Sequence, residues 1–306
     1  MRLCSNRRAS LILSLALSHF ALYAQPGTEP VGAGPILIPV LVTDSFGRFV
    51  SGLREQNFMI FEDDRPQTIS TFSPNYDAPI SIGILLDLSG SMSEKLALER
   101  AGALQFLKLS NPHDEFFVVA SNNHPTLTAD FTSSVDEIDA RIKTLETGHG
   151  TALLDAVCFA LEKLQHANYR RRALLIISDG DENASHHSES DVRSAIRETG
   201  AQVDSILMVN MARRGELTIE EREGPAFLNS ISNDSGGRVL LVNNPSEMST
   251  MATAAAASLR NQYLLAYRTD NSRADGKWRK VKVKLQDSRS SQLTVHASTG
   301  YYAPSQ

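Results

Sequence analysis

Cysteine is scarce in this chain of 306 residues, which contains Cys4 and Cys158 and no others. Three arginines and no acid accompany an apolar stretch at residues 11–22 that is followed by Ala24, a pattern typical of a secretory signal peptide over residues 1–24. Removal of this peptide leaves Cys158 alone, which excludes an intramolecular disulfide. Because Cys158 falls inside an apolar helical pattern, we interpret it as a small core residue.

A long hydrophobic run is also missing. The stretch 11–22 is interrupted by Ser14, Ser18 and His19, and it is shorter than the ~20 residues that span a bilayer. Cys4 precedes the stretch, whereas a bacterial lipoprotein signal would place its modified cysteine after it. We therefore expect no lipid anchor, no stable membrane insertion after signal cleavage, and a secreted or periplasmic protein of the cell envelope.

The chain lacks an excess of positive charge. It contains 30 Lys and Arg against 35 Asp and Glu. Without the three arginines of residues 1–24 the balance is 27 against 35, a net charge of −8. Such a chain is a poor general binder of nucleic acid, so no nucleic-acid partner is expected. Residues 268–289 are locally basic, and we interpret them as a solvated strand face because lysines alternate there with Val281, Val283 and Leu285.

The pattern of apolar residues divides the chain into segments with different predicted structure. Residues 25–35 are turn formers and predict a flexible lead-in. From residue 79 to 260, apolar runs alternate with helical patterns, which predicts a parallel sheet covered on both faces. The predicted strands are 80–86, 116–120, 173–177, 203–209 and 238–242, and the predicted helices are 93–109, 135–145, 152–166, 191–199, 219–232 and 247–260.

Strand patterns dominate both ends of the chain. The segment 36–78 predicts a strand at 36–43 and a hairpin of 58–61 with 68–72, and the segment 261–306 predicts strands at 262–267, 278–285 and 292–297. Neither segment has enough strands for a two-sided core, so we predict that they form one small β-sandwich together. The predicted fold class is α/β, with a doubly wound, mostly parallel sheet at 79–260 and a flanking β-sandwich.

Oxygen-bearing side chains follow the first strand of the predicted sheet. Asp87, Ser89 and Ser91 occupy alternate positions at its carboxyl end, where open α/β sheets place ligand sites. One carboxylate and two hydroxyls suit a hard divalent cation. A serine-rich turn that caps the next helix would explain the same tripeptide pattern.

Two further segments converge on the same edge. Thr151 follows a Gly-His-Gly sequence at the start of a predicted helix, and Asp179 lies just after the predicted strand 173–177 and precedes a glycine. Because the carboxyl ends of parallel strands meet at one edge, three oxygen-bearing loops are expected to lie together.

At these residues the chain resembles the von Willebrand factor type A (VWFA) domain. Asp87, Ser89, Ser91, Thr151 and Asp179 match all five positions of its metal ion-dependent adhesion site, and the resemblance covers roughly residues 79–260. The flanking segments, among them Phe61-Glu62-Asp63-Asp64-Arg65-Pro66-Gln67 and Gln262-Tyr263-Leu264-Leu265-Ala266-Tyr267, resemble bacterial VWFA-related proteins found largely in acidobacteria. Two residues depart from the pattern, since His149 and Asp64 stand where glycine is usual.

The resemblance implies a Rossmann-like VWFA fold and a function. It implies that the five residues hold Mg²⁺, with Ca²⁺ or Mn²⁺ as alternatives, and that an acidic residue of a protein partner completes the coordination. Hard cations of this kind prefer oxygen ligands. The expected protein is therefore an exported, non-enzymatic binding module.

Two other functions remain open, a metal-dependent hydrolase or phosphotransferase that uses Asp87, and a structural component of the envelope. The sequence lacks a Gly-x-Ser-x-Gly elbow, a phosphate-binding Gly-Lys-Ser/Thr loop and a paired cysteine nucleophile, which disfavours an enzyme.

Other polar residues near these loops have simpler interpretations. His186 and His187 are expected to face solvent, because no cysteine or second spaced pair supports a zinc site. Asp155 is expected to form hydrogen bonds near a helix start. Asp181, Glu182 and Asn122 are candidates for a partner surface around the ion, with Asp181 and Glu182 as an acidic rim.

Overall fold

The protein is described by a computed structural model over residues 34–208, 219–286 and 290–305. The predicted signal peptide and most of the predicted lead-in lie outside the described residues. In the described part of the chain, no helix is both long enough and apolar enough to cross a membrane.

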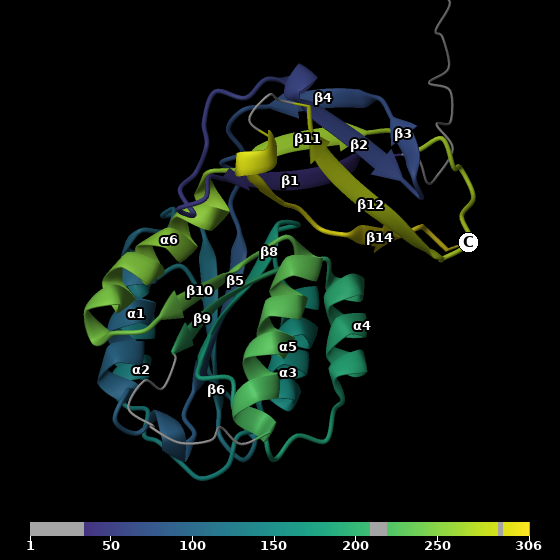
Figure 1. Ribbon diagram of the computed structural model, residues 1–306. Helices are drawn as coiled ribbons and strands as arrows, with labels where there is room; N and C mark the ends of the chain where they lie inside the picture. The colour runs from purple at the N-terminus through teal and green to yellow at the C-terminus, as the bar shows by residue number, and fades with distance from the viewer. Residues whose placement is uncertain (1–33, 209–218, 287–289, 306) are drawn as a thin grey trace, which may run out of the picture. The chain divides into compact units, whose positions relative to one another are not determined.

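A six-stranded sheet occupies the middle of the chain (Figure 1). Its strand order is β10-β9-β8-β5-β6-β7, and every neighbouring pair is parallel except β6 and β7. The strands are β5 (Ser81–Asp87), β6 (Glu115–Ser121), β7 (Pro125–Thr132), β8 (Arg172–Ser178), β9 (Gln202–Met208) and β10 (Val239–Val242).

Helices cover both faces of this sheet (Figure 1). One face packs against α1 (Leu96–Lys108), α2 (Val135–Lys143) and α6 (Met248–Arg260). The other packs against α3 (Leu153–Gln165), α4 (Glu189–Thr199) and α5 (Ile219–Ser235). Short 3-10 helices lie at η1 (Glu55–Asn57), η2 (Gly90–Met92), η3 (Pro245–Glu247) and η4 (Ser290–Gln292).

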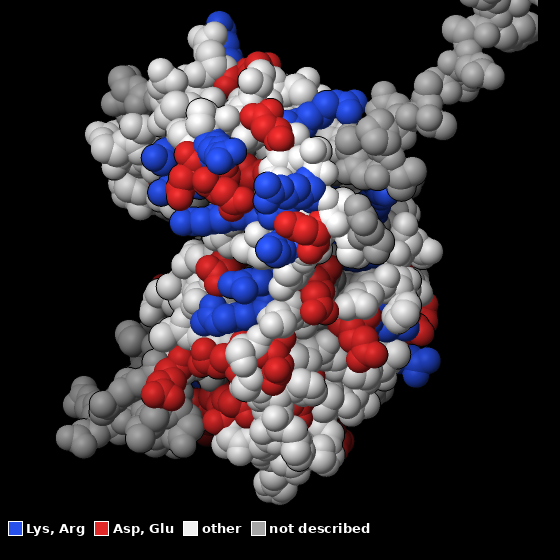
Figure 2. Space-filling model, turned by 90° about the vertical axis from the view of Figure 1, so that its right-hand side faces the viewer, with Lys and Arg blue, Asp and Glu red and all other residues white. Residues whose placement is uncertain are grey.

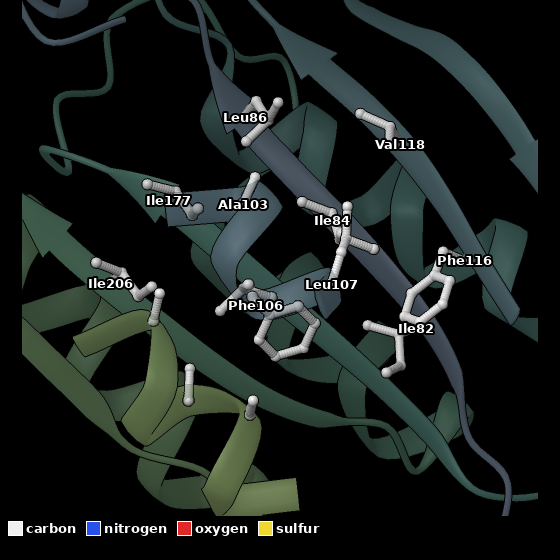
Figure 3. Packing of buried hydrophobic residues seen from close by; sticks show 14 of the residues in the cluster. Ile82, Ile84, Leu86, Ala103, Phe106, Leu107, Phe116, Val118, Ile177 and Ile206 are labelled. Atoms are coloured by element: carbon white, nitrogen blue, oxygen red, sulfur yellow. The ribbon is translucent and has the colours of Figure 1, made fainter. Parts of the chain in front are cut away.

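The central strand β5 shows why the sheet needs two apolar faces. All seven of its residues are buried. Ile82, Ile84 and Leu86 belong to the same buried cluster as Phe106 of α1 (Figure 3), whereas Leu85 belongs to the cluster on the opposite face. Successive side chains of a strand point to opposite faces, so a continuous apolar run is the pattern of a strand covered on both sides.

Two four-stranded antiparallel sheets combine the two ends of the chain. The first has the order β13-β1-β11-β4 and the second β14-β12-β2-β3. Their strands are β1 (Ile36–Thr43), β2 (Phe58–Glu62), β3 (Arg65–Gln67), β4 (Ile69–Ser73), β11 (Tyr263–Tyr267), β12 (Trp278–Leu285), β13 (Thr294–His296) and β14 (Gly300–Tyr302). The amino-terminal strands β1 and β2 pair with the carboxyl-terminal strands β11 and β12.

A third buried cluster fills the space between these sheets. It joins Val40 and Ile60 from the amino-terminal segment to Leu265 and Val281 from the carboxyl-terminal one. The predicted fold class, including a β-sandwich built from both ends of the chain, is therefore confirmed. The residue boundaries of the domains, 36–78, 79–260 and 261–306, stay a prediction.

Two details of the prediction are wrong. The strand 58–61 was expected to pair with 68–72, but β2 pairs with β3 and β4 pairs with β11 in the other sheet. Asp63 and Asp64 explain the difference, because their positive φ angles of 46° and 63° form a two-residue hairpin turn that aligns Glu62 with Arg65.

The second error is the omission of β7 and β14. In β7, Leu127, Ala129 and Phe131 alternate with polar residues, but only Ala129 among them is fully buried. The strand lies at the edge of the sheet and pairs irregularly with β6, so its apolar signal is weaker than that of the central strands.

The basic segment forms a strand face as expected. Lys280, Lys282 and Lys284 of β12 are exposed, whereas Val281 is buried and Val283 is half-buried. On the molecular face that Figure 2 shows, basic side chains are interspersed with acidic ones. This face therefore presents mixed charge rather than one continuous basic surface.

Candidate metal centre

The first loop of the candidate site begins where β5 ends. Asp87 is fully buried, and its Oδ1 accepts a hydrogen bond of 3.0 Å from the backbone N–H of Ser89. The hydroxyl oxygens of Ser89 and Ser91 lie 3.0 Å apart. Ser89 is buried and Ser91 is exposed, so this pair of hydroxyls extends from the interior to the surface.

The second loop, residues 148–151, precedes α3. The N–H of Gly148 donates to the carbonyl oxygen of Leu88 at 2.7 Å, which joins this loop to the first. Gly150 has a φ of +72°, and a Cβ at this position would lie 2.1 Å from Oδ1 of Asn123. The positive φ therefore favours glycine just before Thr151, which is 2% exposed.

The third loop follows β8 and contacts both of the others. The Ser178 hydroxyl donates to Asp87 Oδ2 at 2.6 Å, which joins it to the first loop. The N–H of Thr151 donates to Oδ1 of Asn183 at 3.0 Å, and the Thr151 carbonyl accepts from the N–H groups of Asn183 and Ala184. The three loops thus form a closed set of hydrogen bonds, and each contains at least one predicted ligand.

Negative charge accumulates beneath this edge of the sheet. Burial, followed by the charge of Asp179, raises the pKa of Asp87 to about 6, although hydrogen bonds from Ser178 and Ser89 act in the opposite direction. Glu99 of α1 is fully buried, and its Oε1 accepts from the Asp87 N–H at 2.7 Å. Burial and the charge of Asp87 also raise the pKa of Glu99 well above its usual value.

Lys95 supplies positive charge to the same site. Its Nζ donates to Asp179 Oδ2 at 2.9 Å, and the two side chains are 17% and 7% exposed. Lys95 and Glu99 are not among the residues predicted from the sequence. Spacing could have indicated Glu99, because the buried positions of α1 are Glu99, Gly102, Ala103, Phe106 and Leu107, a single helical stripe.

The donor chemistry of this site fits a hard divalent ion. The five predicted ligands offer two carboxylates and three hydroxyls, all oxygen donors of the kind that Mg²⁺ takes. Glu99, whose Oε1 accepts the Asp87 N–H, has its Oε2 buried without a hydrogen-bond partner. No group of three or more His, Cys, Asp or Glu side chains that could hold a metal occurs in the described part of the chain. A zinc-type or carboxylate-rich site is therefore not found there.

The two histidines near the site face solvent as expected. The side chains of His186 and His187 are 82% and 51% exposed. Their backbone N–H groups and Nδ1 atoms all lie within hydrogen-bond distance of the Asp155 carboxylate. Burial acts to raise the pKa of Asp155, but these hydrogen bonds outweigh it and lower the pKa. Asp155 therefore fastens residues 186 and 187 to the first turn of α3.

Glu182 accepts hydrogen bonds that connect the third loop to α3, and its place in an acidic rim stays a prediction. Its Oε2 accepts the backbone N–H of Leu154 in the first turn of α3 at 2.9 Å, and its Oε1 accepts from the N–H groups of Ala184 and Ser185. The free N–H groups at a helix start favour a carboxylate. Glu182 is therefore a structural cap that holds the third loop against α3.

Comparison with known proteins relates part of the chain to a family. A family model described as the von Willebrand factor type A domain matches residues 82–182. No curated protein matches the chain. Among solved structures, the chain is similar to a von Willebrand factor type A protein from Catenulispora acidiphila, with 12% identity and a TM-score of 0.51 over 91% of this chain and 75% of that one.

Two further structures share less of the chain. The vWF domain of the type V pili tip protein Mfa5 from Porphyromonas gingivalis has 11% identity and a TM-score of 0.49 over 60% of this chain and 96% of that one. The conserved hypothetical protein BatB from Bacteroides thetaiotaomicron has 17% identity and a TM-score of 0.46 over 58% and 98%. The match at residues 82–182 spans all five predicted ligands and four of the six strands of the sheet. The chain therefore carries a von Willebrand factor type A domain.

Proposed function

We propose that the protein is an exported, metal-dependent binding module that engages an acidic residue of a protein partner. The observation that carries this proposal is the closed set of hydrogen bonds among the three loops. These bonds hold the loops of Asp87, Thr151 and Asp179 in fixed relation, as a preorganised ion site requires.

Each ligand has a distinct task in this proposal. Ser89, Ser91 and Thr151 offer neutral hydroxyl oxygens, and Asp87 and Asp179 offer the two carboxylates. Because three of the five donors are uncharged, the site leaves a divalent ion with unneutralised positive charge. A bound Mg²⁺ would supply an open coordination position for an anionic oxygen. A carboxylate of the partner is the protein group with that chemistry.

Ser89 provides the clearest test. Its hydroxyl is a predicted ligand, whereas Ser93, two residues beyond Ser91, is exposed and is not one. Ser89→Ala should weaken Mg²⁺ or Mn²⁺ binding at least about tenfold, the loss that even outer-shell changes at metal sites produce. Ser93→Ala should bind as the wild type does. Isothermal titration calorimetry measures both, and circular dichroism verifies that each variant is folded.

Partner recognition is tested with the same two variants. A protein captured by the wild type and by Ser93→Ala should be released by chelator and should not be captured by Ser89→Ala. Replacement of one Asp or Glu of that protein by Ala should abolish binding. Capture that survives both chelator and Ser89→Ala would contradict the proposal, and Mg²⁺-dependent turnover of ester or phosphate substrates would favour an enzyme instead.

A further inference from the structure

A largely buried ion pair lies inside the candidate metal centre. Lys95 Nζ and Asp179 Oδ2 are 2.9 Å apart, and neither side chain is more than 17% exposed. Lys95 lies at the N-terminal boundary of α1, four residues after Ser91. A long lysine side chain loses rotational freedom when it is held in this way, so the pairing has to outweigh an entropic cost.

The pair occupies an oxygen that a metal ion would also attract. Asp179 Oδ1 accepts the Asp181 N–H at 3.4 Å, while Oδ2 accepts from Lys95. The predicted ligands Asp87 and Asp179 both carry carboxyl groups, and the Asp87 N–H donates to the buried carboxyl group of Glu99 at 2.7 Å. Lys95 is the cationic side chain bonded directly to one of the predicted ligands.

We propose that Lys95 is an internal cation that competes with the divalent ion for Asp179. This inference rests on the proposed metal-binding function and names what sets its ion affinity. Lys95 keeps the metal-free site charge-compensated and folded, and the incoming ion either displaces its ammonium group or binds against its repulsion.

Loss of the Lys95 charge should have opposite effects on the stability of the metal-free protein and on its affinity for the ion. Loss of the Lys95 charge leaves Asp179 unpaired in the metal-free protein, which lowers the free energy of unfolding of that form. The same loss removes a competitor and a like charge from the ion site, which tightens ion binding. If Lys95 were purely structural, its loss would lower the free energy of unfolding without raising the affinity for the ion. Measuring both quantities therefore separates the two roles.

The test uses the full mature chain and four substitutions. Lys95→Met removes the charge, Lys95→Gln removes it but can still hydrogen-bond to Asp179, and Lys95→Arg retains it. Lys108→Met removes an exposed lysine at the far end of the same helix and serves as the control. Calorimetric titration with Mn²⁺ and urea unfolding in the presence of chelator are measured for each variant.

Lys95→Met and Lys95→Gln should bind Mn²⁺ about tenfold more tightly or better, and should unfold at lower urea concentration than the wild type when metal is absent. Added Mn²⁺ should raise the urea midpoint of these variants more than that of the wild type. Lys95→Arg and Lys108→Met should bind the ion as the wild type does. If Lys95→Met does not fold without metal, Lys95→Gln decides the question.

The failure of this inference differs from the failure of the proposed function. Wild-type Mn²⁺ binding with unchanged or weaker binding by both neutral variants overturns the role of Lys95 and leaves the metal site intact. No Mn²⁺ binding by the wild type or by any variant overturns the metal site and the competition together. Unchanged metal-free stability in both neutral variants would also overturn the charge compensation assigned to Lys95.

Discussion

Glu99 places a carboxyl group at a buried position where an apolar side chain would be usual. It lies on the buried stripe of α1, and its Oε1 accepts the backbone N–H of Asp87 while Oε2 has no partner. Asp87 is the last residue of β5, so this hydrogen bond fixes the point at which the strand ends and the first loop begins. The role of Glu99 is therefore to position Asp87 through the backbone.

This role predicts different effects for two substitutions. Glu99→Gln keeps the Oε1 acceptor and removes the buried charge, so it should change the free energy of unfolding little. Glu99→Ala leaves the Asp87 N–H unpaired and opens a cavity, and it should be less stable than Glu99→Gln by roughly 2–3 kcal/mol. Urea unfolding measures the difference. Equal destabilisation by both would mean that the charge of Glu99, not its acceptor atom, is what the fold needs.

The segment between β8 and α4 is held against the start of α3 by several hydrogen bonds. Glu182 caps the first turn of α3, Asn183 accepts the Thr151 N–H, and Asp155 holds the N–H groups of residues 186 and 187. The segment contains Asp179 and is fastened to the helix that follows Thr151. The loops that contain Thr151 and Asp179 are therefore both held by the start of α3.

Removal of the cap should loosen this support. Glu182→Ala takes the acceptor from Leu154 and should lower the free energy of unfolding by about 1–2 kcal/mol, as loss of a helix cap does. Glu162→Ala removes an exposed glutamate from the same helix and should stay within about 0.5 kcal/mol of the wild type. Thermal or urea unfolding distinguishes them. A Glu182→Ala protein as stable as Glu162→Ala would show that solvent satisfies the helix start equally well.

The sequence allowed the strands and helices of the central sheet to be predicted, because continuous apolar runs and helical stripes are strong local signals. It did not allow β7 to be recognised, since this edge strand buries little. It also could not reveal the β2–β3 turn, where two aspartates adopt positive φ angles. The five predicted ligands were identified from their positions at the ends of predicted strands and the start of a predicted helix, and the family resemblance matched all five. Their role in metal binding stays a prediction. Lys95 could not be predicted from the sequence, because its role depends on a contact with Asp179, 84 residues away along the chain.

Arg171 forms hydrogen bonds at both points where the chain passes between the sandwich and the central sheet. Its guanidinium donates to the carbonyl oxygens of Tyr76 and Ala78 just before β5, and to the Leu259 carbonyl and Gln262 Oε1 at the end of α6. A central segment that leaves the sandwich and returns to it needs both of its ends in one place. Arg171 supplies a single group that bonds to both.

Loss of this group should uncouple the two halves of the molecule. Arg171→Met leaves several carbonyl groups without their donor and should cost about 3 kcal/mol, whereas Arg170→Met, at an exposed neighbour, should cost little. Trp278 is the only tryptophan and lies in the sandwich strand β12, while all six described α-helices belong to the central segment. Tryptophan fluorescence and far-ultraviolet circular dichroism should therefore report one urea transition in the wild type and two in Arg171→Met. Coincident transitions in Arg171→Met would show that other contacts couple the halves.

The direction of β5 and β8 has a mechanical consequence. Both strands start beside the crossing points held by Arg171 and end at Asp87 and Ser178, so they connect the sandwich to the candidate metal edge lengthwise (Figure 1). A partner that pulls on this edge would load the strands along their axes. Because β5 and β8 run in the same direction, their covalent backbones would carry such a load together, and the hydrogen bonds between them keep the two strands side by side. Under the proposed function, traction on the candidate metal edge would therefore pass along the strands to the sandwich.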